Sequence, residues 1–145
     1  KAALDANNNV TAIAIKGGAI PESAIHENRF PAGAFENYIA EGWDIPSNLT
    51  VGAFRAPGSN FIASAEQSFL DELAETIGKD PLDYRLELLR KAKANPVGKR
   101  NDYDADRYIA VLELVKEKSN WAARPKNARS ATVKIKNDFI EKIKI

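Results

Sequence analysis

The chain has 145 residues, of which 44% are hydrophobic, and its formal net charge at pH 7 is +1. This length suits a single domain with an ordinary core, and the near-zero charge gives no overall field that would select nucleic acid or an acidic membrane. The absence of cysteine excludes disulfides, thiolate metal ligands and cysteine-ligated iron–sulfur clusters. No apolar run has the length of a membrane span and no segment has the pattern of a signal peptide. The absence of cysteine does not settle the compartment, which is left open between cytoplasm and periplasm.

Residues 1–16 are predicted to form a β-hairpin. Lys1–Leu4 and Val10–Ile15 supply the two strands. Asp5–Asn9 supplies the turn, because Asp and Asn tolerate left-handed backbone and hydrogen-bond to their own chain. The second strand alternates only loosely between apolar and polar residues, which is compatible with burial on both faces.

Residues 17–48 are interpreted as irregular, because glycines and prolines interrupt any long periodic pattern. Within them, Ala34–Ala40 is predicted to hold a short helix. His26 is the single histidine of the chain. With no second His and no Cys to complete a ligand set, it is interpreted as a structural or exposed residue, and no metal ligand is assigned.

Leu49–Ala53 is predicted to be a strand that leads into the loop Phe54–Phe61, where Pro and Gly break regular structure. A helix is predicted from Ile62 to the residues before Gly78, since apolar side chains recur at steps of three and four. Phe69 and Leu73 lie at the centre of this apolar stripe, and both are expected to be buried.

A second helix is predicted from Pro81 to about Ala94. Gly78 is placed to close the first helix in the left-handed conformation, and Asp80 is placed to cap the second. Arg85 is interpreted as a tie between the two helices. The residues expected to point inward are Leu82, Leu86 and Leu89, with Tyr84 or Leu88 on the flank.

A third helix is predicted from Ala105 to about Ser119, with Asp104 as its cap. Its apolar face is expected to contain Tyr108, Val111, Leu112 and Val115. Residues 130–145 are predicted to form a second hairpin, because Thr and Lys alternate with Val and Ile before the Asn137-Asp138 turn.

These elements predict an α+β fold in a single domain over residues 1–145. Two hairpins and the strand before Arg55 would form a small antiparallel or mixed sheet, with about three helices on one face. The expected parts are a hairpin (1–16), an irregular stretch (17–48), the Arg loop and helices (49–121) and a second hairpin (130–145).

One stretch, Gly52–Leu89, carries a composite signature. An aromatic-Arg-small loop (FRA) is followed by a helix reading SFLDELA, then by GKDP and an Arg four residues beyond the Pro. This signature resembles the large, molybdenum-binding subunit of the molybdenum hydroxylases. The nearest branch is the isoquinoline 1-oxidoreductase type, with xanthine dehydrogenase and aldehyde oxidase as more distant relatives. The resemblance extends thinly over Lys1–Trp121.

The family's subunit is several times longer than this chain, so the chain is expected to be a fragment of one. A start at Lys1 and the absence of Met agree with an excised internal segment. The resemblance implies a molybdopterin cofactor carrying molybdenum in the parent protein. It also implies hydroxylation of an N-heterocycle or aldehyde with water, and electron transfer to an iron–sulfur small subunit.

The resemblance also implies the site residues. In the family the aromatic-Arg pair lies beside the molybdenum, so Phe54 and Arg55 are the expected cofactor-binding residues, and amides of their loop could donate to an oxo ligand. Pro57 stands where xanthine-oxidising relatives have a substrate-stacking Phe, so no aromatic clamp is carried over. The family's catalytic glutamate has no match here. No catalytic residue is assigned, and the isolated chain is expected to be inactive and free of cofactor.

Two other functions fit the same pattern. The first is a non-catalytic protein-interaction domain. The second is a helix-turn-helix module, whose second helix would carry Arg85, Arg90, Lys91 and Lys93. The near-zero net charge disfavours the second. The expected partners are therefore the rest of the large subunit and the iron–sulfur subunit, with no nucleic acid and no membrane span.

Overall fold

A computed structural model describes residues 1–20, 23, 25, 27–52, 55–56, 62–94 and 103–123. These residues form a small sheet and three α-helices, which confirms the predicted α+β class. The elements are β1 (Ala2–Leu4), β2 (Val10–Ala19), β3 (Asn37–Asp44), α1 (Ile62–Thr76), α2 (Pro81–Ala94), α3 (Ala105–Lys118) and a 3₁₀ turn, η1 (Trp121–Ala123). The predicted hairpin over 130–145 lies outside the described residues.

The first hairpin is formed as the sequence predicts. β1 pairs antiparallel with β2, with Ala2 opposite Ile13. The side chain of Asp5 holds the turn, because its Oδ1 accepts hydrogen bonds from the backbone N–H groups of Asn7 and Asn9, each at 2.8 Å. Asn8 adopts the left-handed conformation with φ 61°. The turn therefore uses the self-bonding Asx chemistry expected from its composition.

β3 overturns the prediction of a short helix over Ala34–Ala40 and of an irregular stretch over 17–48. It pairs in parallel with β2 in continuous register, from Ala12 opposite Asn37 to Ala19 opposite Asp44. The physical reason is tertiary. The side chains of β3 alternate between the helix side of the sheet and its open side, and hydrogen bonds to β2 outweigh a weak local helix preference.

The strand predicted over Leu49–Ala53 is also wrong for its described part, since residues 45–52 belong to no strand there. Leu49 and Val51 are exposed, and no strand of the described residues lies beside them to complete a ladder. A β-rich sequence without a hydrogen-bonded neighbour has no reason to stay extended as a strand.

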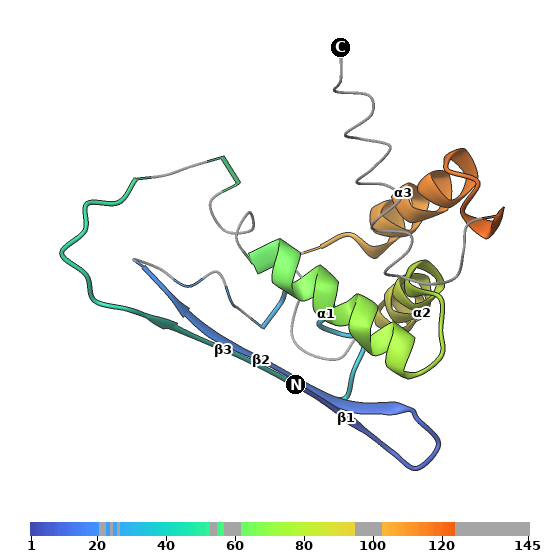
Figure 1. Ribbon diagram of the computed structural model, residues 1–145, viewed down its shortest axis with the longest axis horizontal. Helices are drawn as coiled ribbons and strands as arrows, with labels where there is room; N and C mark the ends of the chain where they lie inside the picture. Colours follow the sequence, from blue (N-terminus) through green and yellow to red (C-terminus); the bar gives the residue numbers. More distant parts are fainter. Residues whose placement is uncertain are drawn as a thin grey trace.

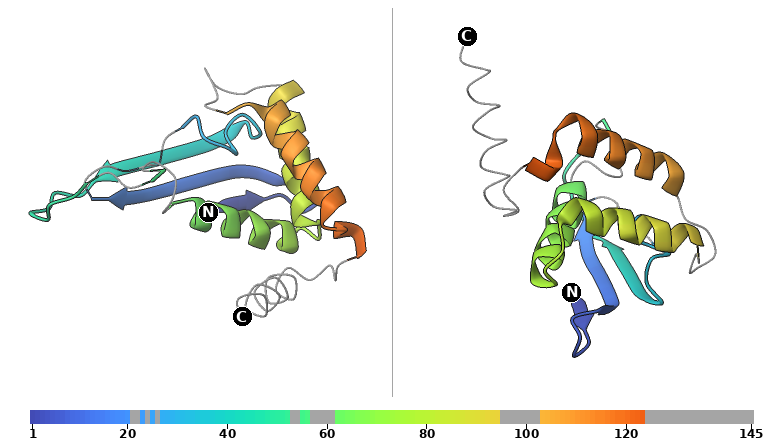
Figure 2. Two further views of the ribbon diagram at one scale, coloured as in Figure 1. Left: turned by 90° about the horizontal axis from the view of Figure 1, so that it is seen from above. Right: turned by 90° about the vertical axis from the view of Figure 1, so that its right-hand side faces the viewer.

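The molecule is layered (Figures 1 and 2). α1 and α2 lie over one face of the three-stranded sheet, and α3 lies against α2 on the side away from the sheet. The opposite face of the sheet is open in the described part, and there the Trp43 indole covers Gly18, so that a Cβ at position 18 would overlap it. No helix among the described residues is long and apolar enough to cross a membrane.

The core lies between β2 and the helix pair α1–α2. Leu73 is buried as predicted, whereas Phe69 is only half-buried and Glu66 is buried instead. The buried side of α1 is therefore turned by about one residue from the predicted stripe. The central cluster contains Ile13, Ala34, Phe35, Leu70, Leu73, Ala74, Tyr84, Leu88 and Ala92.

α2 is buried on more than one side, because it lies between α1 and α3. Leu82, Leu86 and Leu89 point inward as predicted. Tyr84 and Leu88, expected on the flank, are also fully buried. A helix that contacts neighbours on two sides buries a wider arc than a single amphipathic stripe.

The helix ends behave as the sequence predicts. Gly78 has φ 72°, and the Lys79 N–H donates to the Ala74 carbonyl at 2.8 Å, which closes α1. Asp80 Oδ1 accepts from the N–H groups of Leu82 and Asp83 at 2.9 and 3.0 Å. At α3, Asp104 caps in the same way through the Arg107 N–H.

Candidate functional site

The candidate site is the loop before α1, of which the structure describes Arg55 and Ala56. Both residues are exposed and lie in a bend. Ala56 has φ 53°, in the left-handed region, although it is not a glycine and a proline follows it. Such a conformation costs about 1–2 kcal/mol for a residue with a Cβ. Strained backbone of this kind is concentrated in ligand-binding and catalytic loops. Phe54, the other predicted site residue, lies outside the described residues.

Arg55 brings positive charge to this loop, and α1 begins shortly after it in the chain. The chain leaves the end of β3 and runs outward through residues 45–52, and α1 begins at Ile62 (Figure 1). The first turn of α1 contains no acidic residue that would offset the positive end of the helix dipole. A guanidinium suits a ligand that presents acceptor oxygens, and the N-terminal end of a helix suits such a ligand as well.

A cofactor site would need a hollow and, for a metal, a group of ligand side chains. Hollows lined by described residues lie beside β1, β2 and β3 and between the helices, and Arg55 lines none of these. Within the same residues, no group of three or more His, Cys, Asp and Glu side chains could hold a metal ion. His26 lies outside the described part of the chain.

Arg85 ties α1 to α2 as the sequence predicts. Its Nε donates to Gln67 Oε1 at 2.8 Å, and its Nη2 donates to the Gln67 carbonyl at 2.8 Å. Its Nη1 donates to Asp71 Oδ1 at 2.7 Å and to the Pro81 carbonyl at 2.8 Å. Four contacts from one guanidinium fix the angle between the helices.

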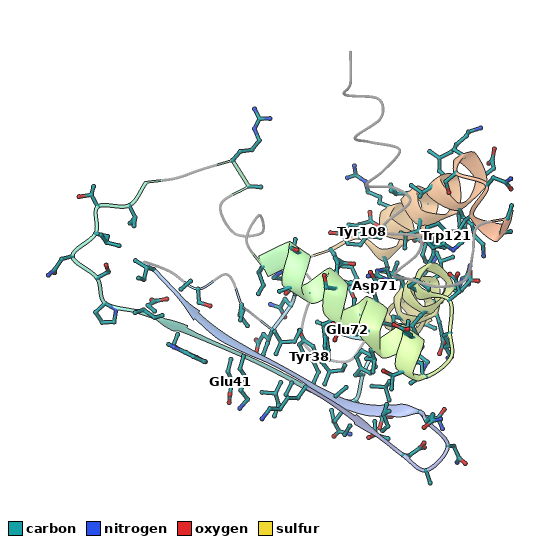
Figure 3. The ribbon with its side chains drawn as sticks, in the orientation of Figure 1. Tyr38, Glu41, Asp71, Glu72, Tyr108 and Trp121 are labelled. Carbon is teal, nitrogen blue, oxygen red and sulfur yellow. The ribbon has the colours of Figure 1, made fainter. Side chains whose placement is uncertain are left out.

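Asp71 and Glu72 do not form a catalytic pair. Asp71 is the partner of Arg85, and Glu72 is exposed on another side of α1 (Figure 3). Adjacent helix residues point about 100° apart, which is why the two carboxylates diverge. Their role in the described structure is that of a helix tie and a solvated surface charge.

Sequence reasoning missed a buried ion pair between the segment before β3 and α1. Arg29 Nη2 lies 3.0 Å from Glu66 Oε2, and the Glu66 side chain is only 8% exposed. Tyr38 lies on the same side of the sheet (Figure 3), and burial, reinforced by the Glu66 charge, raises its pKa to about 12. Glu66 shares the apolar side of α1 with Leu70 and Leu73. A carboxylate on the apolar side of a helix must be paired if it is buried, so Glu66 was the signal in the sequence that could have indicated this ion pair.

The basic residues of α2 are occupied by acids on neighbouring turns and on α3. Arg90 pairs with Glu113 at 3.1 Å and Lys93 with Asp106 at 2.6 Å, while Lys91 pairs with Glu87 on its own helix. A recognition helix must present its basic side to the groove of a duplex. Because α2 is packed between α1 and α3, this arrangement argues against a helix-turn-helix function.

The comparisons give no relative. Neither the models of protein families, nor the curated proteins, nor the solved structures include a match to this chain. A functional assignment therefore stands on the signature of Gly52–Leu89 and on the geometry of its residues.

Proposed function

We propose that the chain is a segment of the molybdopterin-binding subunit of a molybdenum hydroxylase of the isoquinoline 1-oxidoreductase type. The observation that carries this proposal is the exposed Arg55 beside the left-handed Ala56, in a loop whose sequence opens the family signature. In the parent, Phe54 and Arg55 would face the cofactor. The guanidinium and the loop amides would hold acceptor oxygens without moving.

The spacing of the rest of the signature has a physical basis, which supports the proposal. Gly78 supplies the left-handed closure of α1, Asp80 caps α2, and Arg85 binds back to α1. Each function depends on the position of the residue relative to the helix joint. A shift of one residue in GKDP or in the Arg would lose these contacts, so this spacing is what a helix hairpin with this joint requires.

The parent enzyme would hydroxylate an N-heterocycle or an aldehyde with oxygen from water, and would pass electrons to an iron–sulfur small subunit. The molybdopterin cofactor supplies the metal-centred oxygen and electron transfer when bound. This chain would contribute one wall of the site, where Arg55 would bind and orient the acceptor oxygens of the cofactor. No described residue is assigned as a catalytic base, and none is assigned as a metal ligand.

The rest of the parent subunit is the proposed partner of the open sheet face. Ile39 and Trp43 on β3 are about half exposed, and Leu49 just beyond is 71% exposed. Parallel strand pairs such as β2–β3 are normally covered on both faces. An exposed apolar surface beside an uncovered parallel pair is the mark of a contact with further protein.

The test is made in the parent subunit, expressed with its iron–sulfur partner. Arg55→Ala is expected to lower molybdenum content or turnover with an N-heterocycle about 10- to 100-fold, as loss of a residue next to the metal ligands does. Arg90→Ala, which removes only an exposed ion pair on α2, is the matched control and should leave both unchanged.

Two results would contradict the proposal. One is a parent protein that contains no molybdenum and turns over neither an N-heterocycle nor an aldehyde. The other is stoichiometric molybdenum or turnover in the isolated 145-residue chain, which would show a complete enzyme rather than a segment. A stable complex of the molybdenum-free parent with another protein would instead favour the non-catalytic interaction domain, for which the exposed apolar side chains of β3 also argue.

A further inference from the structure

α3 turns apolar side chains to the surface. None of its described residues is buried, and four large apolar side chains are between 46% and 59% exposed. They recur at steps of three and four along one side of the helix, and we call them the outer stripe: Tyr108, Val111, Leu114 and Val115. In a globular domain such a stripe normally faces a core. A contiguous exposed stripe indicates a contact surface.

The side of α3 that faces α2 is held largely by charges. Lys93 pairs with Asp106, Arg90 with Glu113, and Lys116 with Asp83. Leu112 and Ile109 are half-buried on this side. Ion pairs and two half-buried apolar side chains therefore hold α3 on α2, while the outer stripe stays about half exposed.

The outer stripe continues into a hollow between the helices. Its volume is about 300 Å³, and its lining consists of Phe30, Gln67, Arg85, Leu89, Tyr108, Val111 and Leu112. The Tyr108 ring stacks on Tyr103 with centroids 5.7 Å apart, and Tyr103 packs edge-on against Phe30. Arg85 is already engaged with α1 and Pro81. The hollow therefore suits an apolar side chain rather than an anion.

We propose that the outer stripe and this hollow are the docking surface for the chain's own C-terminal segment, residues 124–145. The segment begins directly after η1, which follows α3, and Trp121 of η1 is fixed to Asp80 Oδ2 at 2.9 Å. The stripe spans eight helical residues, about 12 Å. Ten extended residues reach about 33 Å. The segment is therefore long enough to return along α3, and its large apolar residues are Val133, Ile135, Phe139, Ile140, Ile143 and Ile145.

The net charges of residues 124–145 and of the rest of the chain have opposite signs. Residues 124–145 contain seven Lys or Arg and two Asp or Glu, a net charge of +5, so residues 1–123 carry −4 of the chain's total of +1. Arg107 and Lys118 border the stripe, and Lys118 pairs with Glu117 at 2.9 Å. The attraction comes from the acidic body as a whole rather than from neighbours of the stripe, and salt should weaken it. The inference does not depend on the proposed function.

Hydrogen exchange of the full chain tests the docking. Amides of residues 131–145 are expected to exchange at least about tenfold more slowly than in a free peptide of residues 124–145. Val111→Asp in the stripe should bring the exchange rates of these amides within about twofold of those in the peptide. The control is Ile39→Asp, a similarly exposed position on β3, which should leave the protection unchanged. Unchanged protection of α1 amides verifies that each variant is folded.

Three outcomes would overturn the inference. The first is exchange of residues 131–145 at the peptide rate in the unmodified chain. The second is protection that survives Val111→Asp or that is lost in Ile39→Asp, which would move the contact to another surface. The third is protection that grows with protein concentration, which would assign the stripe to the segment of a second copy.

Discussion

Tyr84 combines a buried ring with an unpaired hydroxyl. The residue is 2% exposed within the central cluster, and the described residues provide no hydrogen-bond partner for its hydroxyl oxygen. Tyr103 offers the opposite case, because its hydroxyl donates to the carbonyl of Ala32. The two tyrosines therefore separate the effect of a buried ring from the effect of a buried hydrogen bond.

We predict that Tyr84→Phe leaves the free energy of unfolding unchanged or raises it by about 1 kcal/mol, because an unsatisfied buried hydroxyl is removed. Tyr103→Phe should lower it by about 1 kcal/mol, because a hydrogen bond is lost and the Ala32 carbonyl loses its partner. Urea denaturation of the three proteins measures both. A loss greater than about 1 kcal/mol in Tyr84→Phe would mean that the hydroxyl is bonded after all.

At the scale of elements, the joint between α1 and α2 rests on Gly78. Its φ is 72°, and a Cβ added there would have no heavy atom within 4 Å. A substitution is therefore opposed by backbone strain alone, without a steric clash. Gly52 has equally open space but no positive φ.

We predict that Gly78→Val lowers the free energy of unfolding by about 1–2 kcal/mol through left-handed strain. Gly52→Ala is the matched control, and it should be neutral or slightly stabilising because only chain entropy changes. Thermal or chemical denaturation compares them. Equal midpoints for the two variants would show that α1 does not need a left-handed residue at its end.

The elements that could be predicted from the sequence are those determined by residues close to them in the chain. The helices and their caps were predictable, since Gly78, Asp80 and Asp104 act within a few residues of their own position. β3 was not predictable in this way, because its partner strand β2 is distant in the sequence. Asn37 of β3 pairs with Ala12 of β2, 25 residues earlier. At the site, the position of Arg55 in a loop followed from Pro57 and Gly58. The left-handed conformation of Ala56 has no local signal in the sequence. The carboxylate of Glu66 on the apolar side of α1 indicates burial, but it does not identify its partner Arg29, which lies 37 residues earlier in the chain.

At the scale of the whole molecule, three tyrosines from separate parts of the fold share one response to pH. Burial raises the pKa of Tyr38 on β3, Tyr84 on α2 and Tyr103 before α3, each to about 12. An unfolded tyrosine titrates near pH 10. Since the folded pKa is the higher one, the neutral form is favoured by folding. The contribution of each group to stability is complete below pH 10 and is lost as the pH rises through 12.

We predict that the free energy of unfolding falls between pH 10 and pH 12, and that part of the phenolate absorbance appears only as the chain unfolds. Denaturation midpoints and a spectrophotometric titration over this range give the two curves. Replacing Tyr38 by Phe should remove one late-titrating group. All tyrosines ionising together near pH 10 with an unmoved midpoint would contradict the burial of these rings.

The indole of Trp43 over Gly18 gives the open face of the sheet an optical label. The chain has two tryptophans, and they differ in setting, since Trp43 is 53% exposed while Trp121 donates its indole N–H to Asp80. A neutral quencher in solution will therefore reach Trp43 more readily. When a further layer of protein covers β3, the emission of Trp43 should shift to shorter wavelength and escape the quencher. Assembly on this face can thus be followed by intrinsic fluorescence, with no dye and no added cysteine.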